Sequence, residues 1–143
     1  MQSTEALTEI ITAAYRLARV VAQEAGSTTP TAQWRALTVL EESGPMRVGA
    51  LAAACRVTQP GMTRLVELMA AAGLVEKRPD PADARAAVIQ ITDSGSAARR
   101  AWIDTVGEVL APKFAGLSDE DWAAIRTTAA LLNARTDLMN GAE

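Results

Sequence analysis

Apolar side chains recur at three- and four-residue spacing along most of the chain, which is the pattern of amphipathic helices. This spacing, together with capping residues, predicts helices over residues 5–25, 30–42, 49–54, 58–72, 93–115 and from Ser118 onward. Between two of them, residues 74–92 carry proline and aspartate in the middle and β-branched residues at the far end. That composition predicts a two-stranded hairpin, so the fold class is mainly α with a small β-hairpin.

Capping residues place several of the helix ends. Thr29 followed by Pro30 has the pattern of an N-cap with proline at the first helical position. We expect Thr58, Thr92 and Ser118 each to cap the helix that follows. Residues 46–48 are long enough only for an edge strand.

The helix over residues 58–72 has two different faces when its side chains are placed at 100° per residue. One face forms a predicted core stripe of Met62, Leu65, Val66 and Met69. The opposite face carries Pro60, Thr63, Arg64, Glu67 and Ala71. Its first turn is slim, which allows close approach to base edges, and its backbone N–H groups can face phosphates.

The hairpin carries Arg85 between small residues, close to an Asp80-Pro81 turn. An arginine at a hairpin tip suits the narrow, negative minor groove of DNA, and Asp83 could hold its guanidinium by a charge-assisted hydrogen bond. A solvated hairpin with a surface ion pair explains the same residues equally well. The elements before it decide: two short helices, a slim third helix and a hairpin describe a winged helix-turn-helix.

Charge and composition narrow the function classes. The net charge of the chain is −3, but residues 56–100 carry +2 and the remainder −5, and the local balance is what a phosphate backbone meets. The absence of histidine removes the commonest general base and His metal sites, so neither catalysis nor a cofactor is predicted. Cys55 is the only cysteine and is interpreted as a small buried side chain. No apolar run approaches the ~18 residues of a membrane span, so a cytoplasmic protein is expected.

Several short motifs resemble the MarR family of bacterial transcription regulators over about residues 5–140. They are Leu51-Ala52, residues 63–67, residues 72–75, Asp80-Pro81, and residues 83–92 followed by Gly95. The resemblance implies one MarR-like domain over residues 1–143, in which residues 30–92 form the DNA-binding module. Residues 1–28 and 93–143 would then be dimerisation helices flanking it. The implied partners are a second copy of the chain and a pseudo-palindromic operator in double-stranded DNA. Many members are repressors released by small phenolic or amphipathic effectors.

The resemblance also implies roles for individual residues. The recognition-helix positions that face DNA are matched by Gln59, Pro60, Gly61, Thr63 and Arg64. Arg85 matches the wing-tip arginine, Asp83 its supporting acid, and Lys77 and Arg78 the basic residues where the wing begins. Effector candidates are Tyr15, Arg16 and Trp34. Leu68, Ala70 and Ala71 depart from the pattern, since many relatives carry charged residues there. The alternative interpretation is a winged-helix protein–protein interaction module without DNA binding, and the direction of regulation stays open.

Overall fold

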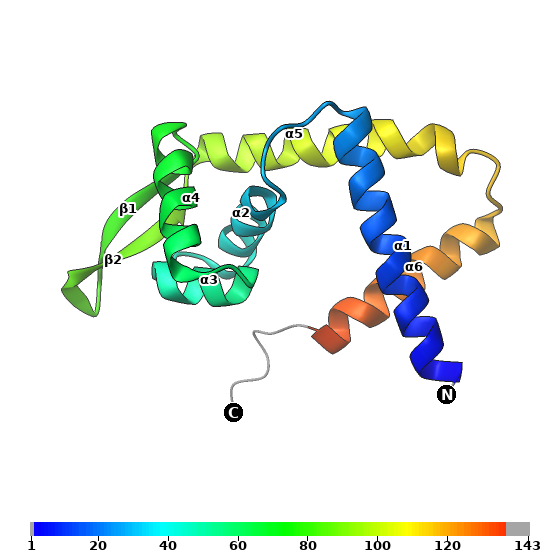
Figure 1. The fold of residues 1–143 in the computed structure, drawn as a ribbon, viewed down its shortest axis with the longest axis horizontal. Coiled ribbons are helices and arrows are strands. Elements are labelled where there is room, and N and C mark those ends of the chain that lie inside the picture. Colours follow the sequence, from blue (N-terminus) through cyan, green and yellow to red (C-terminus); the bar gives the residue numbers. More distant parts are fainter. Residues whose placement is uncertain (1, 137–143) are drawn as a thin grey trace. The chain divides into compact units, whose positions relative to one another are not determined.

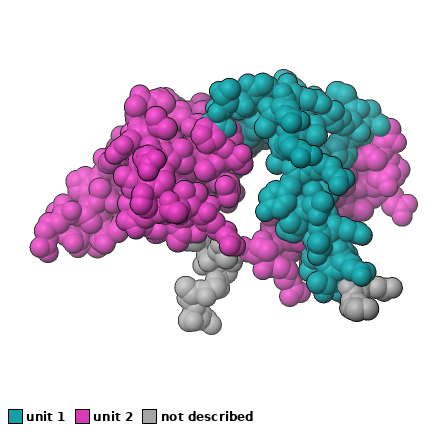
Figure 2. All heavy atoms as spheres, viewed as in Figure 1, with its two compact units in different colours: residues 1–29, 101–115 teal, residues 30–100, 116–143 magenta. Residues whose placement is uncertain are grey.

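The computed structural model describes residues 2–136 and is mainly helical, with one antiparallel hairpin (Figure 1). Its elements are α1 (Gln2–Glu24), α2 (Thr31–Ser43), α3 (Val48–Cys55), α4 (Gln59–Ala71), β1 (Val75–Asp80), β2 (Asp83–Ile91), α5 (Asp93–Leu110), the short 3-10 helix η1 (Ala111–Phe114) and α6 (Asp119–Thr136). The predicted fold class is confirmed. The chain divides into two compact units, residues 1–29 with 101–115 and residues 30–100 with 116–143 (Figure 2), and each is described here by itself.

The core of the second unit is formed by apolar residues of α2, α3, α4 and the hairpin. Its buried members are Ala36, Leu37, Leu40, Leu51, Ala52, Cys55, Met62, Leu65, Val66, Met69, Val75 and Ile89. The four residues expected to form the core stripe of α4 are all among them. Trp34 and Met46 are partly buried against this cluster. Three helices and a hairpin therefore share one apolar core. Packing against this core determines which face of α4 is exposed.

Most of the predicted helix caps are confirmed. The Thr58 hydroxyl accepts a hydrogen bond from the Gly61 N–H at 3.2 Å. Ser118 and Asp121 cap α6 reciprocally, with each backbone N–H donating to the other side chain at 3.1 Å. The prediction for Thr29 is wrong: Pro30 is the N-cap of α2, in an extended conformation and with no side-chain cap. The Thr29 N–H instead donates to the Ser27 hydroxyl. Helix α2 therefore begins one residue later than expected.

Thr92 and Gly95 join the hairpin to α5. The Thr92 hydroxyl donates to the Gly73 carbonyl at 2.6 Å and accepts from the Gly95 N–H at 3.0 Å. A Cβ on Gly95 would lie 2.8 Å from Ile91 Cγ1 and would overlap the Leu74 carbonyl. Only glycine lets the first turn of α5 approach this closely, so the wing has a defined base.

The terminal helices carry apolar side chains that the chain itself leaves exposed. On α1, Leu7, Ile11 and Tyr15 are 53%, 57% and 75% exposed, and their four-residue spacing puts them on one face. On α6, Ile125 and Leu131 are exposed as well. Within the first unit, Lys113 and Glu24 form an ion pair at 2.6 Å.

Candidate nucleic-acid interface

A tight turn between α3 and α4 sets the position of the exposed α4 face. Arg56, directly after α3, adopts a left-handed conformation with φ 55°. The Val57 N–H donates to the Ala52 carbonyl at 3.0 Å and the Arg56 N–H to the Ala53 carbonyl at 3.2 Å. These two bonds form the Schellman ending of a helix, in which glycine is the usual residue. Arg56 is exposed at this turn. Arg56 is not among the DNA-binding residues predicted from the sequence. Its position between two predicted helices, in the turn of a helix-turn-helix, could have indicated it.

The exposed face of α4 is small and carries one basic side chain. Pro60, Arg64 and Leu68 are exposed along it, while Thr63 is partly buried. The Thr63 hydroxyl donates to the Gln59 carbonyl at 3.0 Å, so it is turned back to the helix backbone. Arg64 makes no ion pair with any residue from 2 to 136. The Arg64 guanidinium is thus available to form an ion pair with a binding partner.

The slim first turn of α4 has a structural cause. A Cβ on Gly61 would lie 2.9 Å from the Thr58 hydroxyl oxygen and 3.2 Å from Val57 Cγ1. The cap therefore needs a residue without a side chain at this position. The Gln59 side chain lies against Gly49 of α3, with its Oε1 3.4 Å from where a Gly49 Cβ would be. The N-terminal turn of α4 is held against α3 and presents little bulk outward.

The hairpin register places Arg85 in a bulge. Pairing runs regularly from Val75–Ile91 to Pro79–Ala87 and then shifts to Asp80–Asp83. Residues 84–86 consequently have no partner on β1, and Arg85 is the middle one. The turn itself is formed by Pro81 and Ala82, so the prediction of an arginine at the tip is corrected: Arg85 follows the tip. A bulge re-aims the side chain that it carries, and the Arg85 side chain is 95% exposed.

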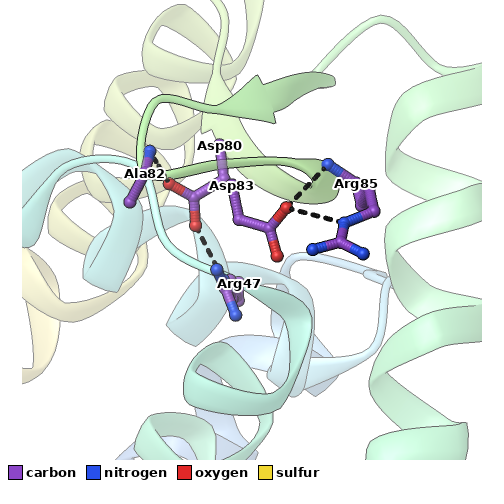
Figure 3. A network of polar contacts seen from close by, with 5 residues as sticks. All are labelled: Arg47, Asp80, Ala82, Asp83 and Arg85. Carbon is purple, nitrogen blue, oxygen red and sulfur yellow. Dashed lines mark hydrogen bonds and ion pairs between the residues drawn. The ribbon is translucent and has the colours of Figure 1, made fainter.

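Asp83 holds the backbone of this bulge more closely than it holds the guanidinium. Its Oδ1 accepts from the Arg85 N–H at 3.0 Å, whereas the Arg85 Nε lies 3.5 Å away (Figure 3). The second distance is at the outer limit of a hydrogen bond. The expected Asp83–Arg85 contact exists, and it leaves the guanidinium available.

A second network fixes the turn (Figure 3). Asp80 accepts from the Ala82 N–H at 2.9 Å through one carboxylate oxygen and from the Arg47 Nε at 2.7 Å through the other. The hydrogen bond from Ala82, followed by that from Arg47, lowers the pKa of Asp80 below its usual value. Sequence reasoning missed Arg47, because it lies 33 residues before Asp80 and no local pattern links them.

The basic residues at the start of the wing differ in their contacts. Arg78 forms an ion pair with Glu76 at 2.7 Å. Lys77 forms no ion pair within the described residues, and it is paired in register with the buried Ile89. Opposite residues of an antiparallel pair share a face, so Lys77 lies on the core-side face of the hairpin and Arg78 on the outer one.

The effector candidates belong to different units. Tyr15 and Arg16 are exposed on α1, and Trp34 is partly buried on α2. A surface hollow lined by Thr4, Glu5, Thr8 and Glu9 contains none of them.

Other kinds of site find little support in the part of the chain that the structure describes. Cys55 is buried, as predicted, and burial raises the pKa of its thiol while Arg35 opposes that shift. No group of three or more metal-ligating side chains occurs among residues 2–136. No helix within that range is long and apolar enough to cross a membrane.

The helix-turn-helix of α3 and α4, followed by an antiparallel hairpin, defines a winged helix-turn-helix protein. Residues 27–86 match the model of the MarR family. An uncharacterized HTH-type transcriptional regulator of Mycobacterium bovis is 35% identical over 105 residues, which is 73% of either chain. The chain therefore belongs to the MarR family of transcription regulators.

Solved structures have the same fold. A MarR family protein from Bacillus stearothermophilus superimposes with a TM-score of 0.70 at 22% identity, covering 95% of this chain and 94% of that one. Bordetella bronchiseptica BpsR, whose DNA binding is regulated by 6-hydroxynicotinic acid, gives a TM-score of 0.62 at 22% identity and covers 88% and 91%.

Proposed function

We propose that this chain is a sequence-specific DNA-binding regulator in which α4 enters the major groove and the wing enters the adjacent minor groove. The exposed Arg85, held in a backbone bulge by Asp83, is the observation that carries the proposal. Arg64 supplies the positive charge on α4, with Gln59, Pro60, Gly61 and Thr63 forming the slim surface around it. Lys77, Arg78 and Arg56 are proposed to contact phosphates.

The functional form is a homodimer. The exposed apolar stripe of α1 and the exposed apolar residues of α6 are proposed to supply its interface. Residues 1–28 and 93–143, of which residues 1 and 137–143 lie outside the described residues, would thus serve dimerisation, and residues 30–92 would bind DNA. Two modules related by a two-fold axis read a pseudo-palindromic operator, with half-sites about 34–36 Å apart.

A small amphipathic ligand releases this repressor from its operator. BpsR supports the idea, since a small aromatic acid regulates its binding to DNA. Tyr15, Arg16 and Trp34 are the residues proposed to contact the ligand. The protein works in the cytoplasm without catalysis. A panel of phenols and aromatic acids, tested for raised melting temperature and for loss of operator binding, checks this part.

Selection of bound fragments from a random DNA library, followed by titration at fixed salt, tests DNA binding. Arg85→Ala is expected to weaken operator binding by about 1–3 kcal/mol, the scale of one lost base contact. Arg126→Ala removes an exposed arginine outside the winged module and is the matched control. At a protein concentration where sedimentation shows this variant to be dimeric, it should leave operator affinity unchanged. Affinity should also fall with salt, with a slope near −0.9 per phosphate neutralised. Failure to enrich any sequence at low salt would favour the protein–protein interaction module instead.

A further inference from the structure

The segment that precedes α3 contacts the hairpin at two places. Met46 forms an isolated antiparallel bridge with Ile89, in which the Ile89 N–H donates at 2.8 Å and the Met46 N–H at 3.2 Å. The next residue, Arg47, reaches the far end of the hairpin, where its Nε donates to Asp80 (Figure 3). The wing is therefore fixed at its middle by backbone and at its turn by one side chain.

The far end of the wing has few other supports. Regular strand pairing stops at Pro79 because the register shifts there, and proline donates no hydrogen bond to a ladder. Beyond that point Asp80 links the turn to the helical part of the unit. It accepts one hydrogen bond from Ala82 in the turn and another from Arg47, directly before α3. The Asp80 side chain is only 14% exposed, although it lies next to a turn. This carboxylate therefore links the turn that leads into the Arg85 bulge to the segment before α3.

We propose that Arg47 is a positioning residue that orients the wing for DNA through its ion pair with Asp80, without being a DNA contact itself. The inference rests on the proposed function. It assigns Arg47 a role that acts through Arg85: the ion pair holds the turn, the turn sets the bulge, and the bulge aims the guanidinium at the minor groove. The competing role for an exposed arginine near DNA is a direct phosphate contact.

A double-mutant cycle on the selected operator separates the two roles. Asp80→Asn keeps an oxygen for the Ala82 N–H but removes the charge that pairs with Arg47. Arg47→Gln and Asp80→Asn should each weaken binding about two- to fivefold, the range of an exposed ion pair. Because they break the same link, the double variant should be no weaker than either single variant. In an Arg85→Ala background, Arg47→Gln should have no further effect. Arg47→Lys, which keeps a charge beside Asp80, should restore part of the affinity.

A phosphate contact predicts a different set of results and would overturn the proposal. Asp80→Asn would then leave binding unchanged or strengthen it, and Arg47→Gln would cost the same in every background. It would also reduce the slope of log affinity against log salt by about one. Thermal unfolding of each variant verifies that the module is folded. If the wild-type chain binds no selected DNA, the proposed function fails and this inference fails with it. If the wild type binds and the cycle is additive, only the role of Arg47 is rejected.

Discussion

The winged module and the terminal helices use their apolar residues in opposite ways. The module buries Leu37, Leu40, Leu51 and Met62 almost completely inside one core. On α1, Val21 is the buried apolar residue among those described, while the stripe from Leu7 to Tyr15 stays exposed. Burial of apolar area is the main favourable term in folding. The module is therefore stabilised by a core formed within one chain. The terminal helices carry apolar area that a second copy of the chain would bury.

Disrupting the apolar stripe of α1 should give the largest effect. A Leu7→Glu, Ile11→Glu double variant puts charges into the proposed dimer interface and should make the protein monomeric. Operator affinity should then fall by about 10²- to 10⁴-fold, because one half-site loses the gain from a linked second site. Sedimentation velocity and gel shifts with full and half operators measure both changes. A Ser3→Glu, Glu9→Gln variant, which changes exposed polar positions of α1, is the control. A dimer that persists in the double variant would assign the interface elsewhere.

The core of the module should respond without any dependence on protein concentration. Leu37 is fully buried between the helices of the module, and Leu37→Ala removes about 2–5 kcal/mol of stability in such sites. The loss should be the same at low and high protein concentration, since the module forms its core within one chain. Leu7→Ala is the counterpart: its effect on melting temperature should vanish upon dilution to monomer. Denaturant unfolding at two concentrations compares them. Equal concentration dependence of both variants would remove the distinction between the regions.

The difference between the regions also explains what the sequence could predict. Local signals placed the helices, the stripe from Met62 to Met69, and the caps at Thr58 and Ser118, because these depend on residues three or four apart. The Arg85 bulge could not be predicted, since a register shift depends on which residues of β1 and β2 pair. The Arg47–Asp80 ion pair joins residues far apart in the chain, and only the packed module brings them together. The sequence predicts the slim first turn of α4. It does not predict that the Thr63 hydroxyl donates to the Gln59 carbonyl.

Removing one helix cap in each region sharpens the comparison at a smaller scale. Thr58→Ala and Ser118→Ala each delete an oxygen that accepts a helix N–H, which costs about 1 kcal/mol. Both should lower the free energy of unfolding to a similar extent, but only Thr58→Ala should also weaken operator binding, because it loosens the first turn of α4. Calorimetry and titration with the operator give the two quantities, and Thr58→Ser, which retains the oxygen, is the control. Loss of operator affinity in Ser118→Ala at saturating dimer concentration would contradict the assignment of α6 to dimerisation alone.

Acid should give the smallest effect, and it acts through one carboxylate in each region. Hydrogen bonds from Ala82 and Arg47 lower the pKa of Asp80, and hydrogen bonds from the Ser118 hydroxyl and backbone lower that of Asp121. A carboxyl group whose pKa is lower in the folded chain than in the unfolded one stabilises the fold above its unfolded pKa of about 3.9. That contribution is lost as the pH falls below about 4 and through the folded pKa. Unfolding titrations from pH 6 to pH 2 should therefore show declining stability, and Asp80→Asn and Asp121→Asn should each flatten part of the decline. In an Arg47→Gln background the hydrogen bond from Ala82 to Asp80 remains, so the pKa of Asp80 should stay partly lowered. Asp80→Asn should therefore still flatten the decline in that background, but by less than in the wild type. If Asp80→Asn caused no flattening at all in the Arg47→Gln background, Arg47 and not the turn would dominate the pKa of Asp80. The wing would then depend on the helical part of its unit more than on its own backbone.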